Sequence, residues 1–142
     1  MDVTRTPQNN TGIADSARYE RQLQLPEIGP EGQRLLAQTS VAVVGAGGLG
    51  APILYYLTAA GIGRIAIIDC DVVSPSNLQR QILYQESDLA RPKAIQAQKR
   101  LTALNSTLHI EAITERLNET NVTTLLADYQ ICLLYTSDAA DE

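Results

Sequence analysis

A glycine-rich segment follows a short apolar run and has the residue types needed to bind a phosphate. The apolar run is Val41–Val44, and the glycine-rich segment is Gly45-Ala46-Gly47-Gly48-Leu49-Gly50. Because glycine has no Cβ, backbone N–H groups can approach a phosphate closely, and the start of a helix favours negative charge. Asp69 follows Gly50 at about the 20-residue spacing from which a carboxylate accepts hydrogen bonds from a ribose. The sequence therefore predicts a nucleotide site.

Cationic and polar side chains follow the second apolar run, Arg64–Ile68. The segment Ser76-Asn77-Leu78-Gln79-Arg80-Gln81 begins a few residues after Asp71. In open α/β folds, ligands bind at the carboxyl ends of the strands, so Arg80 and Gln81 are better placed than a random surface pair. Lys93 falls in the first turn of the next predicted helix, where a cation opposes the helix dipole unless an anion lies nearby. This conflict is consistent with a functional lysine. A solvated lysine without a role fits the same pattern equally well.

The two cysteines, Cys70 and Cys132, predict no metal site and no disulfide framework. Cys70 lies between two aspartates, whose negative charge opposes formation of a thiolate. It is therefore expected to be a poor nucleophile.

The pattern of apolar residues predicts the elements that position these side chains. Strands are expected at 41–44, 64–68, 108–113 and 129–134. Helices are expected at 16–25 with a cap at Asp15 or Ser16, at 30–36, from Gly50 to a left-handed Gly61, and after a cap at Asn118. A further helix is expected to start with Arg91-Pro92-Lys93, with Pro92 near its first position, and to continue through 94–104. Its apolar residues at 94, 97, 101 and 104 are expected to form one buried stripe. Alternating strands and helices predict an α/β Rossmann-like three-layer fold with a mostly parallel sheet, truncated after roughly the fourth strand.

Length and composition favour one domain with a single core. The chain has 142 residues and a net charge of −5, which argues against a general nucleic-acid-binding role. It has no apolar run of membrane-spanning length and no secretory core, so a cytoplasmic location is expected by default. We expect a disordered arm at 1–15 and a nucleotide-binding part at 16–131.

Four motifs together resemble one family. They are Arg18-Tyr19-Glu20-Arg21-Gln22, the glycine-rich segment, Asp69-Cys70-Asp71 with its following SNLQRQ, and Arg91-Pro92-Lys93. Over roughly residues 17–131 the chain resembles the MoeB/ThiF group of adenylyltransferases, which are relatives of the ubiquitin-activating enzymes. The resemblance implies an enzyme that uses ATP and Mg²⁺ to adenylate the C-terminal glycine carboxylate of a small ubiquitin-like sulfur-carrier protein. Pyrophosphate is released, and the pathway is molybdopterin or thiamine biosynthesis.

The resemblance also implies roles for individual residues. Asp69 is expected to hold the ribose, while Asn77, Arg80 and Lys93 contact the phosphates. Arg21 is expected to reach the nucleotide site of the partner in a homodimer, and Arg21, Arg80 and Lys93 are the candidate catalytic residues. The full set of expected nucleotide-binding residues is Gly45, Gly47, Gly48, Gly50, Asp69, Asp71, Ser76, Asn77, Leu78, Gln79, Arg80 and Lys93.

The end of the chain departs from the family pattern. Leu134 stands where the first aspartate of a magnesium-holding segment is expected, and Asp138 and Asp141 are out of register. Residues 132–142 are therefore expected to be a non-native tail that resembles read-through of a sequencing adapter. The paired CxxC motifs that bind Zn²⁺ in full-length members are absent from this sequence.

Two alternatives from other functional classes stay open. They are an NAD(P)-dependent oxidoreductase and a non-catalytic module that binds a nucleotide or a carrier protein. An oxidoreductase is disfavoured because no tyrosine in the sequence has a lysine four residues later.

Overall fold

The computed structural model describes residues 13–135 and the side chains of residues 16–135. Within this range, four strands form one sheet in the order β3-β2-β1-β4, and every neighbouring pair is parallel. The strands are β1 (Ser40–Val44), β2 (Arg64–Ile68), β3 (His109–Ile113) and β4 (Ile131–Leu134). The predicted Rossmann-like parallel fold is confirmed.

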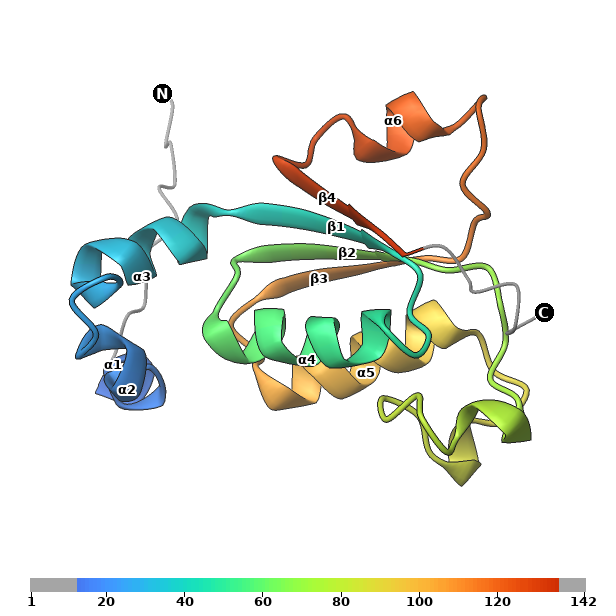
Figure 1. The fold of residues 1–142 in the computed structure, drawn as a ribbon, viewed down its shortest axis with the longest axis horizontal. Helices are drawn as coiled ribbons and strands as arrows, with labels where there is room; N and C mark the ends of the chain where they lie inside the picture. The colour runs from blue at the N-terminus through green and yellow to red at the C-terminus, as the bar shows by residue number, and fades with distance from the viewer. Residues whose placement is uncertain (1–12, 136–142) are drawn as a thin grey trace, which may run out of the picture.

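The strand order reverses at β1, in the middle of the sheet, and so creates a topological switch point. The chain builds β1, β2 and β3 outward in one direction and then returns to place β4 on the other side of β1 (Figure 1). Such a reversal of strand order is where open α/β sheets bind their ligands, at the carboxyl ends of the strands. The glycine-rich segment leaves β1 at this end.

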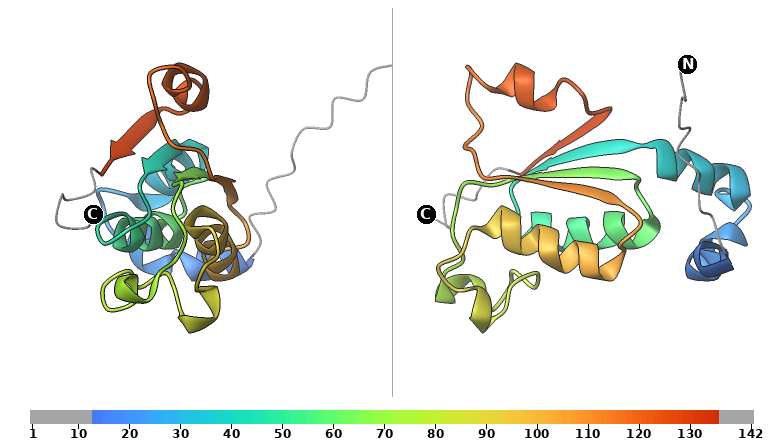
Figure 2. Two further views of the ribbon diagram at one scale, coloured as in Figure 1. Left: turned by 90° about the vertical axis from the view of Figure 1, so that its right-hand side faces the viewer. Right: turned by 180° about the vertical axis from the view of Figure 1, so that it is seen from behind.

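Two helices cover one face of the sheet. They are α4 (Gly50–Ala60) and α5 (Lys93–Leu104), and α6 (Val122–Leu126) lies on the opposite side (Figures 1 and 2). The core forms between the sheet and the helix pair, where Leu54 and Leu101 are fully buried. Gly61 ends α4 in the left-handed conformation, with φ of 91°, as its sequence position predicts.

The opposite face of the sheet carries a polar cluster centred on Glu111. Its carboxylate accepts hydrogen bonds from the Tyr129 hydroxyl at 2.6 Å and the Arg64 guanidinium at 3.1 Å, and it lies 2.8 Å from the His109 ring. The Arg64 guanidinium also stacks over the Tyr129 ring. The cluster ties the segment after α6 to strands β2 and β3.

The N-terminal helices differ from the sequence prediction. The expected helix at 16–25 is divided into α1 (Ile13–Arg18) and α2 (Glu20–Leu23), so the predicted cap at Asp15 or Ser16 is wrong. The division falls at Tyr19, which is buried and accepts a hydrogen bond from Asn105 at 2.8 Å. Burial of this side chain overrides the local helical tendency. Residues 1–12 of the predicted arm lie outside the described residues.

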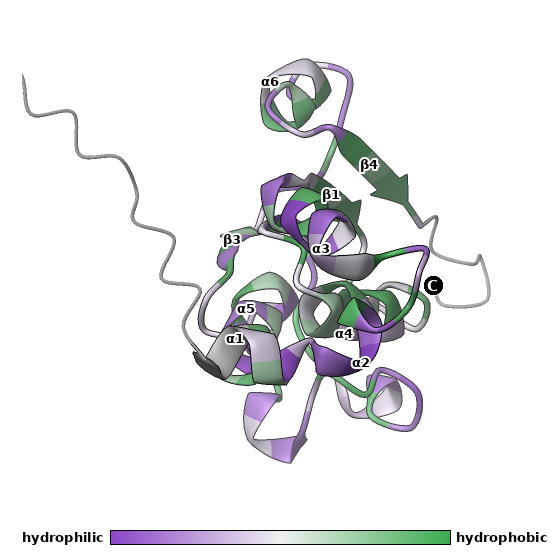
Figure 3. Ribbon diagram, turned by 90° about the vertical axis from the view of Figure 1, so that its left-hand side faces the viewer, coloured by the Kyte–Doolittle hydropathy of each residue, from purple (hydrophilic) through white to green (hydrophobic). Residues whose placement is uncertain are grey.

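The other elements agree closely with their expected positions, with small corrections. Helix α3 (Gly29–Gln38) has Pro30 in its first turn, as predicted. Pro92 precedes α5 as its N-cap, and Leu104, expected in the buried stripe, is exposed. Strand β4 is apolar throughout in Figure 3 and exposes Ile131 and Leu134 at the sheet edge. Within residues 13–135, the helices are too short or too polar to cross a membrane.

Candidate functional site

The segment Gly45–Gly50 forms a tight loop whose shape requires glycine at two positions. Gly45 has φ of 96°, in the left-handed region that favours glycine. At Gly50 an added Cβ would collide with the carbonyl oxygen of Gly45. The loop therefore folds back on itself before α4, and its backbone is positioned to bind an anion at the start of that helix.

Ala46 is fixed from both sides of its peptide backbone. Its N–H donates to Asp69 Oδ2 at 2.8 Å, and its carbonyl accepts from the Tyr84 hydroxyl at 2.7 Å. Tyr84 is buried, and burial raises the pKa of its hydroxyl, followed by the effect of the Asp69 and Asp88 charges. The hydroxyl therefore remains a donor, and it connects the loop to the segment that follows Arg80.

Asp69 directly follows β2 and lies beside the glycine loop, as its spacing in the sequence predicts. Its second oxygen, Oδ1, accepts from the backbone N–H of Asp71 at 2.8 Å. The carboxylate thus joins the loop after β1 to the turn after β2. Each oxygen has two lone pairs, so both can still accept from a ribose hydroxyl.

The segment from Ser74 to Gln81 forms a short 3₁₀ turn, η1 (Pro75–Asn77), beside the glycine loop. Asn77 Oδ1 accepts from the Ser74 backbone N–H and from the Ser74 hydroxyl, both at 2.9 Å. Arg80 donates to the Ser76 carbonyl at 2.9 Å, and its side chain lies against Gly48. The turn therefore places a guanidinium directly against the predicted phosphate loop.

Two residues of this segment have different environments. Leu78 packs against the hydrophobic core, whereas Gln79 is exposed. Leu78 anchors the turn, and both remain predicted nucleotide-binding residues.

Lys93 opens α5 with a side chain that is only 7% exposed. Its ammonium lies 4.0 Å from Asp71 Oδ2, and its backbone N–H donates to the Asp71 carbonyl at 2.9 Å. Since the Asp71 side chain is 70% exposed, this carboxylate compensates the buried cation poorly. The Lys93 charge is therefore unfavourable for two reasons: it lies at the N-terminus of a helix, as predicted, and it is buried.

Contacts connect all of these groups in one continuous path. The glycine loop bonds to Asp69, Asp69 bonds to Asp71, and Asp71 lies beside Lys93, while Arg80 lies against the loop itself. The structure thus brings together the acidic, cationic and glycine residues that lie up to 48 positions apart in the sequence, from Gly45 to Lys93.

Arg21 lies away from this path. It is exposed on α2, and its neighbour Gln22 donates to the carbonyl of Ala60, the last residue of α4. Helix α4 has 11 residues and begins at the glycine loop, so the two ends are about 16 Å apart. Figure 1 shows α2 at the end of the sheet opposite to the loop. Arg21 therefore lies at a distance from the glycine loop of its own chain.

Cys70, at the end of β2, is poorly suited to act as a nucleophile. Partial burial raises the pKa of its thiol, and the Asp71 and Asp69 carboxylates raise it further. Among the described residues, no group of three or more His, Cys, Asp or Glu side chains could hold a metal.

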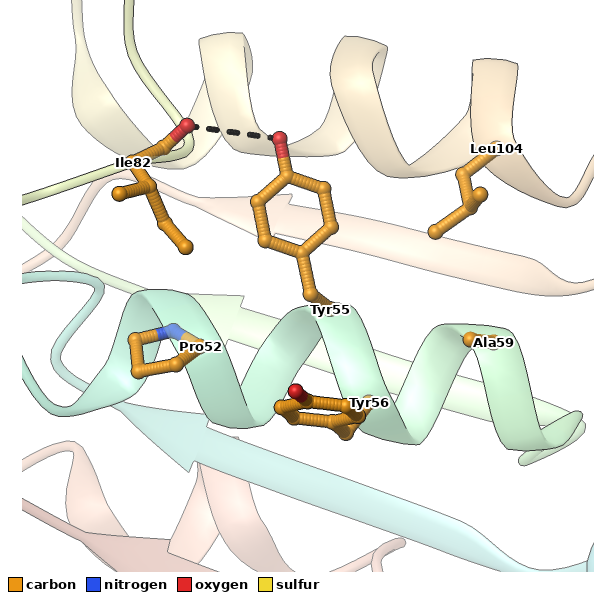
Figure 4. A pocket seen from close by; sticks show the side chains of 6 residues that line it. All are labelled: Pro52, Tyr55, Tyr56, Ala59, Ile82 and Leu104. Carbon is orange, nitrogen blue, oxygen red and sulfur yellow. Dashed lines mark hydrogen bonds between the residues drawn. The ribbon is translucent and has the colours of Figure 1, made fainter.

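An apolar groove of about 350 Å³ lies on the outer side of α4 and α5 (Figure 4). Tyr55 stands across it, with its hydroxyl 3.5 Å from the Ile82 carbonyl. The groove is lined by Pro52, Tyr55, Tyr56, Ala59, Ile82 and Leu104. It has no charged side chain and does not include the groups around the glycine loop.

Two residues of this region had no assigned site role in the sequence analysis. Tyr84 holds the Ala46 carbonyl, and Gln81 lies buried against Gly47. The sequence pattern indicates for Gln81 only a location after the second strand, and it indicates no role for Tyr84. Neither contact has a sequence signal, because each depends on how the turn after Arg80 packs under the loop.

The sequence matches a known family over most of its length. Residues 19–141 match the ThiF family. This chain belongs to the ThiF family. A sulfur carrier protein adenylyltransferase from Thermus thermophilus is 50% identical over 124 residues, which cover 87% of this chain and 44% of that protein. The adenylyltransferase and sulfurtransferase MOCS3 from Danio rerio is 45% identical over 117 residues, covering 82% of this chain and 26% of that protein.

Solved structures with the same fold include nucleotide complexes. The E. coli tRNA N6-threonylcarbamoyladenosine dehydratase TcdA in complex with AMP superposes with a TM-score of 0.84 at 25% identity, covering 89% of this chain and 51% of that chain. E. coli MccB with AMPCPP and MccA has a TM-score of 0.73 at 28% identity, covering 83% of this chain and 36% of that chain. This ThiF-family chain thus spans less than half the length of the two curated relatives named above.

Proposed function

We propose that this chain is the nucleotide-binding part of an enzyme that adenylates the C-terminal glycine carboxylate of a small ubiquitin-like sulfur carrier. The observation that carries the proposal is the position of Lys93 and Arg80. Both cations lie within the path of contacts around the glycine loop and Asp69. A dinucleotide that stays intact develops no new charge on its pyrophosphate, whereas transfer of the adenylyl group from ATP develops charge on the leaving pyrophosphate, which fixed cations stabilise.

The residue roles follow from this arrangement. The backbone of the glycine loop binds the phosphates, and Asp69 accepts hydrogen bonds from the ribose. Arg80, Asn77 and Lys93 contact the phosphates, and Asp71 holds the Lys93 ammonium in place. Ser76, Leu78 and Gln79 shape the turn that presents Arg80.

The chemistry needs charge stabilisation and alignment more than an enzyme nucleophile. A carboxylate oxygen of the carrier attacks the α-phosphorus of ATP and forms the acyl-adenylate. The bond from this phosphorus to the bridging oxygen breaks, and pyrophosphate leaves with the electron pair. Fixed cations that neutralise the developing charge and hold both anions in line lower the barrier. Lys93 and Arg80 supply such charge in one subunit.

A homodimer would complete the site. Because Arg21 lies about one helix length from its own glycine loop, its proposed catalytic role requires that it reach the loop of a second subunit. The names of the relatives support the carrier substrate, since the Thermus thermophilus protein is a sulfur carrier protein adenylyltransferase. The molybdopterin branch is supported by the name of a relative from Porphyra purpurea, a probable molybdopterin-synthase adenylyltransferase.

Magnesium is expected to accompany ATP rather than to occupy a site built by the protein alone. Asp71 is the exposed carboxylate beside Lys93, but Asp69 already accepts two backbone hydrogen bonds. At the end of β4, Leu134 offers no ligand. The described residues therefore fit the nucleotide better than the ion, and no step of the proposal depends on the ion.

ATP–pyrophosphate exchange tests the proposal directly. The protein is incubated with ATP, labelled pyrophosphate and a sulfur-carrier protein that ends in glycine. Label is expected to enter ATP only when the carrier has its terminal carboxylate, and a carrier that ends in an amide is the control. Equal exchange with both carriers would contradict the proposed reaction.

A further inference from the structure

The side chain of Gln81 is a buried polar group without a partner beside the glycine loop. Gln81 is 3% exposed, and its oxygen Oε1 has no hydrogen-bond partner. Among the side chains of residues 16–135 no hydrogen bond uses its nitrogen Nε2 either, but unlike Oε1 this atom is not fully buried. Buried amides in proteins are almost always paired, so an exception calls for a physical reason.

The amide is directed at the predicted phosphate loop. Its nitrogen, Nε2, is the atom closest to the place where a Cβ on Gly47 would stand, at 3.4 Å. Gly47 thus leaves open the space in front of the amide. The loop, the cationic turn and this amide meet at one place, because Arg80 lies against the adjacent Gly48.

The backbone around Gln81 holds the amide in this position. Its N–H donates to the Asn77 carbonyl at 2.8 Å, and its carbonyl accepts from the Tyr84 N–H at 3.1 Å. The Tyr84 hydroxyl in turn holds the Ala46 carbonyl at 2.7 Å. The backbone of the turn from Gln81 to Tyr84 is therefore attached to the loop at its far end.

We propose that Gln81 is a further nucleotide-binding residue, whose amide N–H donates to a phosphate oxygen of ATP bound at the glycine loop. The inference rests on the proposed nucleotide site. A neutral donor adds a hydrogen bond to the anion without adding a third cation beside Arg80 and the buried Lys93. In the free protein Nε2 has no protein acceptor, and the phosphate oxygen would be one, whereas the buried Oε1, itself an acceptor, gains no partner from the phosphate.

A methionine substitution separates this role from a structural one. Gln81→Met keeps a similar shape and removes both polar atoms, so the stability of the free protein is expected to be unchanged or raised. The affinity for ATP is expected to fall roughly tenfold or more, because a hydrogen bond to a charged group is lost. The affinity for adenosine, which has no phosphate, is expected to stay within about twofold of the wild type.

The matched control is Gln98→Met on α5. The Gln98 amide donates to the Ile110 carbonyl at 2.8 Å, away from the loop. This variant is expected to lose stability and to keep its affinity for ATP, the reverse of Gln81→Met. A second variant at the site, Gln81→Glu, keeps the shape but brings a carboxylate toward the phosphate, and it is expected to weaken ATP binding further at pH 8.

Three measurements on each variant test the inference. Calorimetric titration gives the affinity for ATP, displacement by adenosine gives the affinity for adenosine, and thermal unfolding gives the stability. Weaker ATP binding with unaltered adenosine binding in folded Gln81→Met supports the inference, and Gln81→Glu then tests whether the side chain faces the phosphate. Unaltered ATP binding, or an equal loss for ATP and adenosine, would overturn it while leaving the proposed function intact. A wild-type protein that binds no ATP would overturn the proposed function itself, and with it this inference.

Discussion

Replacing Lys93 by methionine is expected to weaken ATP binding without lowering the folding stability of the protein. The Lys93 side chain is 7% exposed, and the nearest carboxylate oxygen, on the largely exposed Asp71, lies 4.0 Å away. An exposed ion pair stabilises a protein by about 0.2–1 kcal/mol. Burying an ammonium costs several kcal/mol, and replacing a buried charge by an apolar side chain of similar volume is often neutral or stabilising by about 1–4 kcal/mol. Lys93→Met is therefore expected to unfold no more easily than the wild type.

The same substitution is expected to weaken ATP binding strongly. Loss of a hydrogen bond to a charged group costs about 1.5–3 kcal/mol, which corresponds to roughly a tenfold to hundredfold rise in Kd. Lys99, an exposed lysine on the same helix, provides the control Lys99→Met, which is expected to change neither quantity. Urea unfolding and calorimetric titration with ATP measure the two effects. A Lys93→Met protein that loses more than about 1 kcal/mol of stability while its ATP affinity is unchanged would refute this reasoning.

Four further predictions concern the loop, the polar cluster and the sheet edge. Gly50→Ala is expected to abolish ATP binding and to cost at least about 2 kcal/mol in urea unfolding, because its Cβ would collide with the Gly45 carbonyl; wild-type affinity would contradict this. Tyr84→Phe is expected to lower the unfolding free energy by about 1–3 kcal/mol, since the buried Ala46 carbonyl loses its donor, and an unchanged urea midpoint would count against it. The hydrogen bond from Tyr129, followed by those from His109 and Arg64, holds the pKa of Glu111 below its usual 4.5. Stability from Glu111 is thus present above that pH and is lost as pH falls through the lower folded pKa. Glu111→Gln should flatten the acid side of the Tm profile, and a profile that stays parallel to the wild type would rule this out. The 142-residue polypeptide is expected to self-associate through β4, which exposes Ile131 and Leu134; Leu134→Asp should reduce light scattering, and a monodisperse unmodified chain would disprove the prediction.

The parts of the fold that depend on local patterns could be predicted from the sequence. The apolar runs at β1 and β2, and the left-handed Gly61, specify their elements without distant contacts. The break at Tyr19 could not be predicted, because it depends on burial of that side chain against Asn105, 86 residues away. Leu104 satisfies the helical period but lies past the edge of the core.

The candidate site shows the same division. Spacing placed the glycine loop, Asp69 and the turn with Arg80 at one edge of the sheet, and the structure brings them into contact. The burial of Lys93 and the contacts of Gln81 and Tyr84 depend on packing after the chain has folded. The predicted roles of Arg21 and of the dimer concern a second subunit and stay predictions. Asp138 and Asp141 of the predicted tail lie outside the described residues.

The most direct test of the account compares ATP with NAD⁺ as ligands of the wild-type protein. Both have a ribose and linked phosphates that the glycine loop and Asp69 could bind, but only ATP carries a β,γ-pyrophosphate that can leave from the α-phosphate. Titration calorimetry at matched salt is expected to show tighter binding of ATP, and Lys93→Met should remove most of the difference. Tighter binding of NAD⁺ would contradict the adenylyltransferase proposal and favour an oxidoreductase.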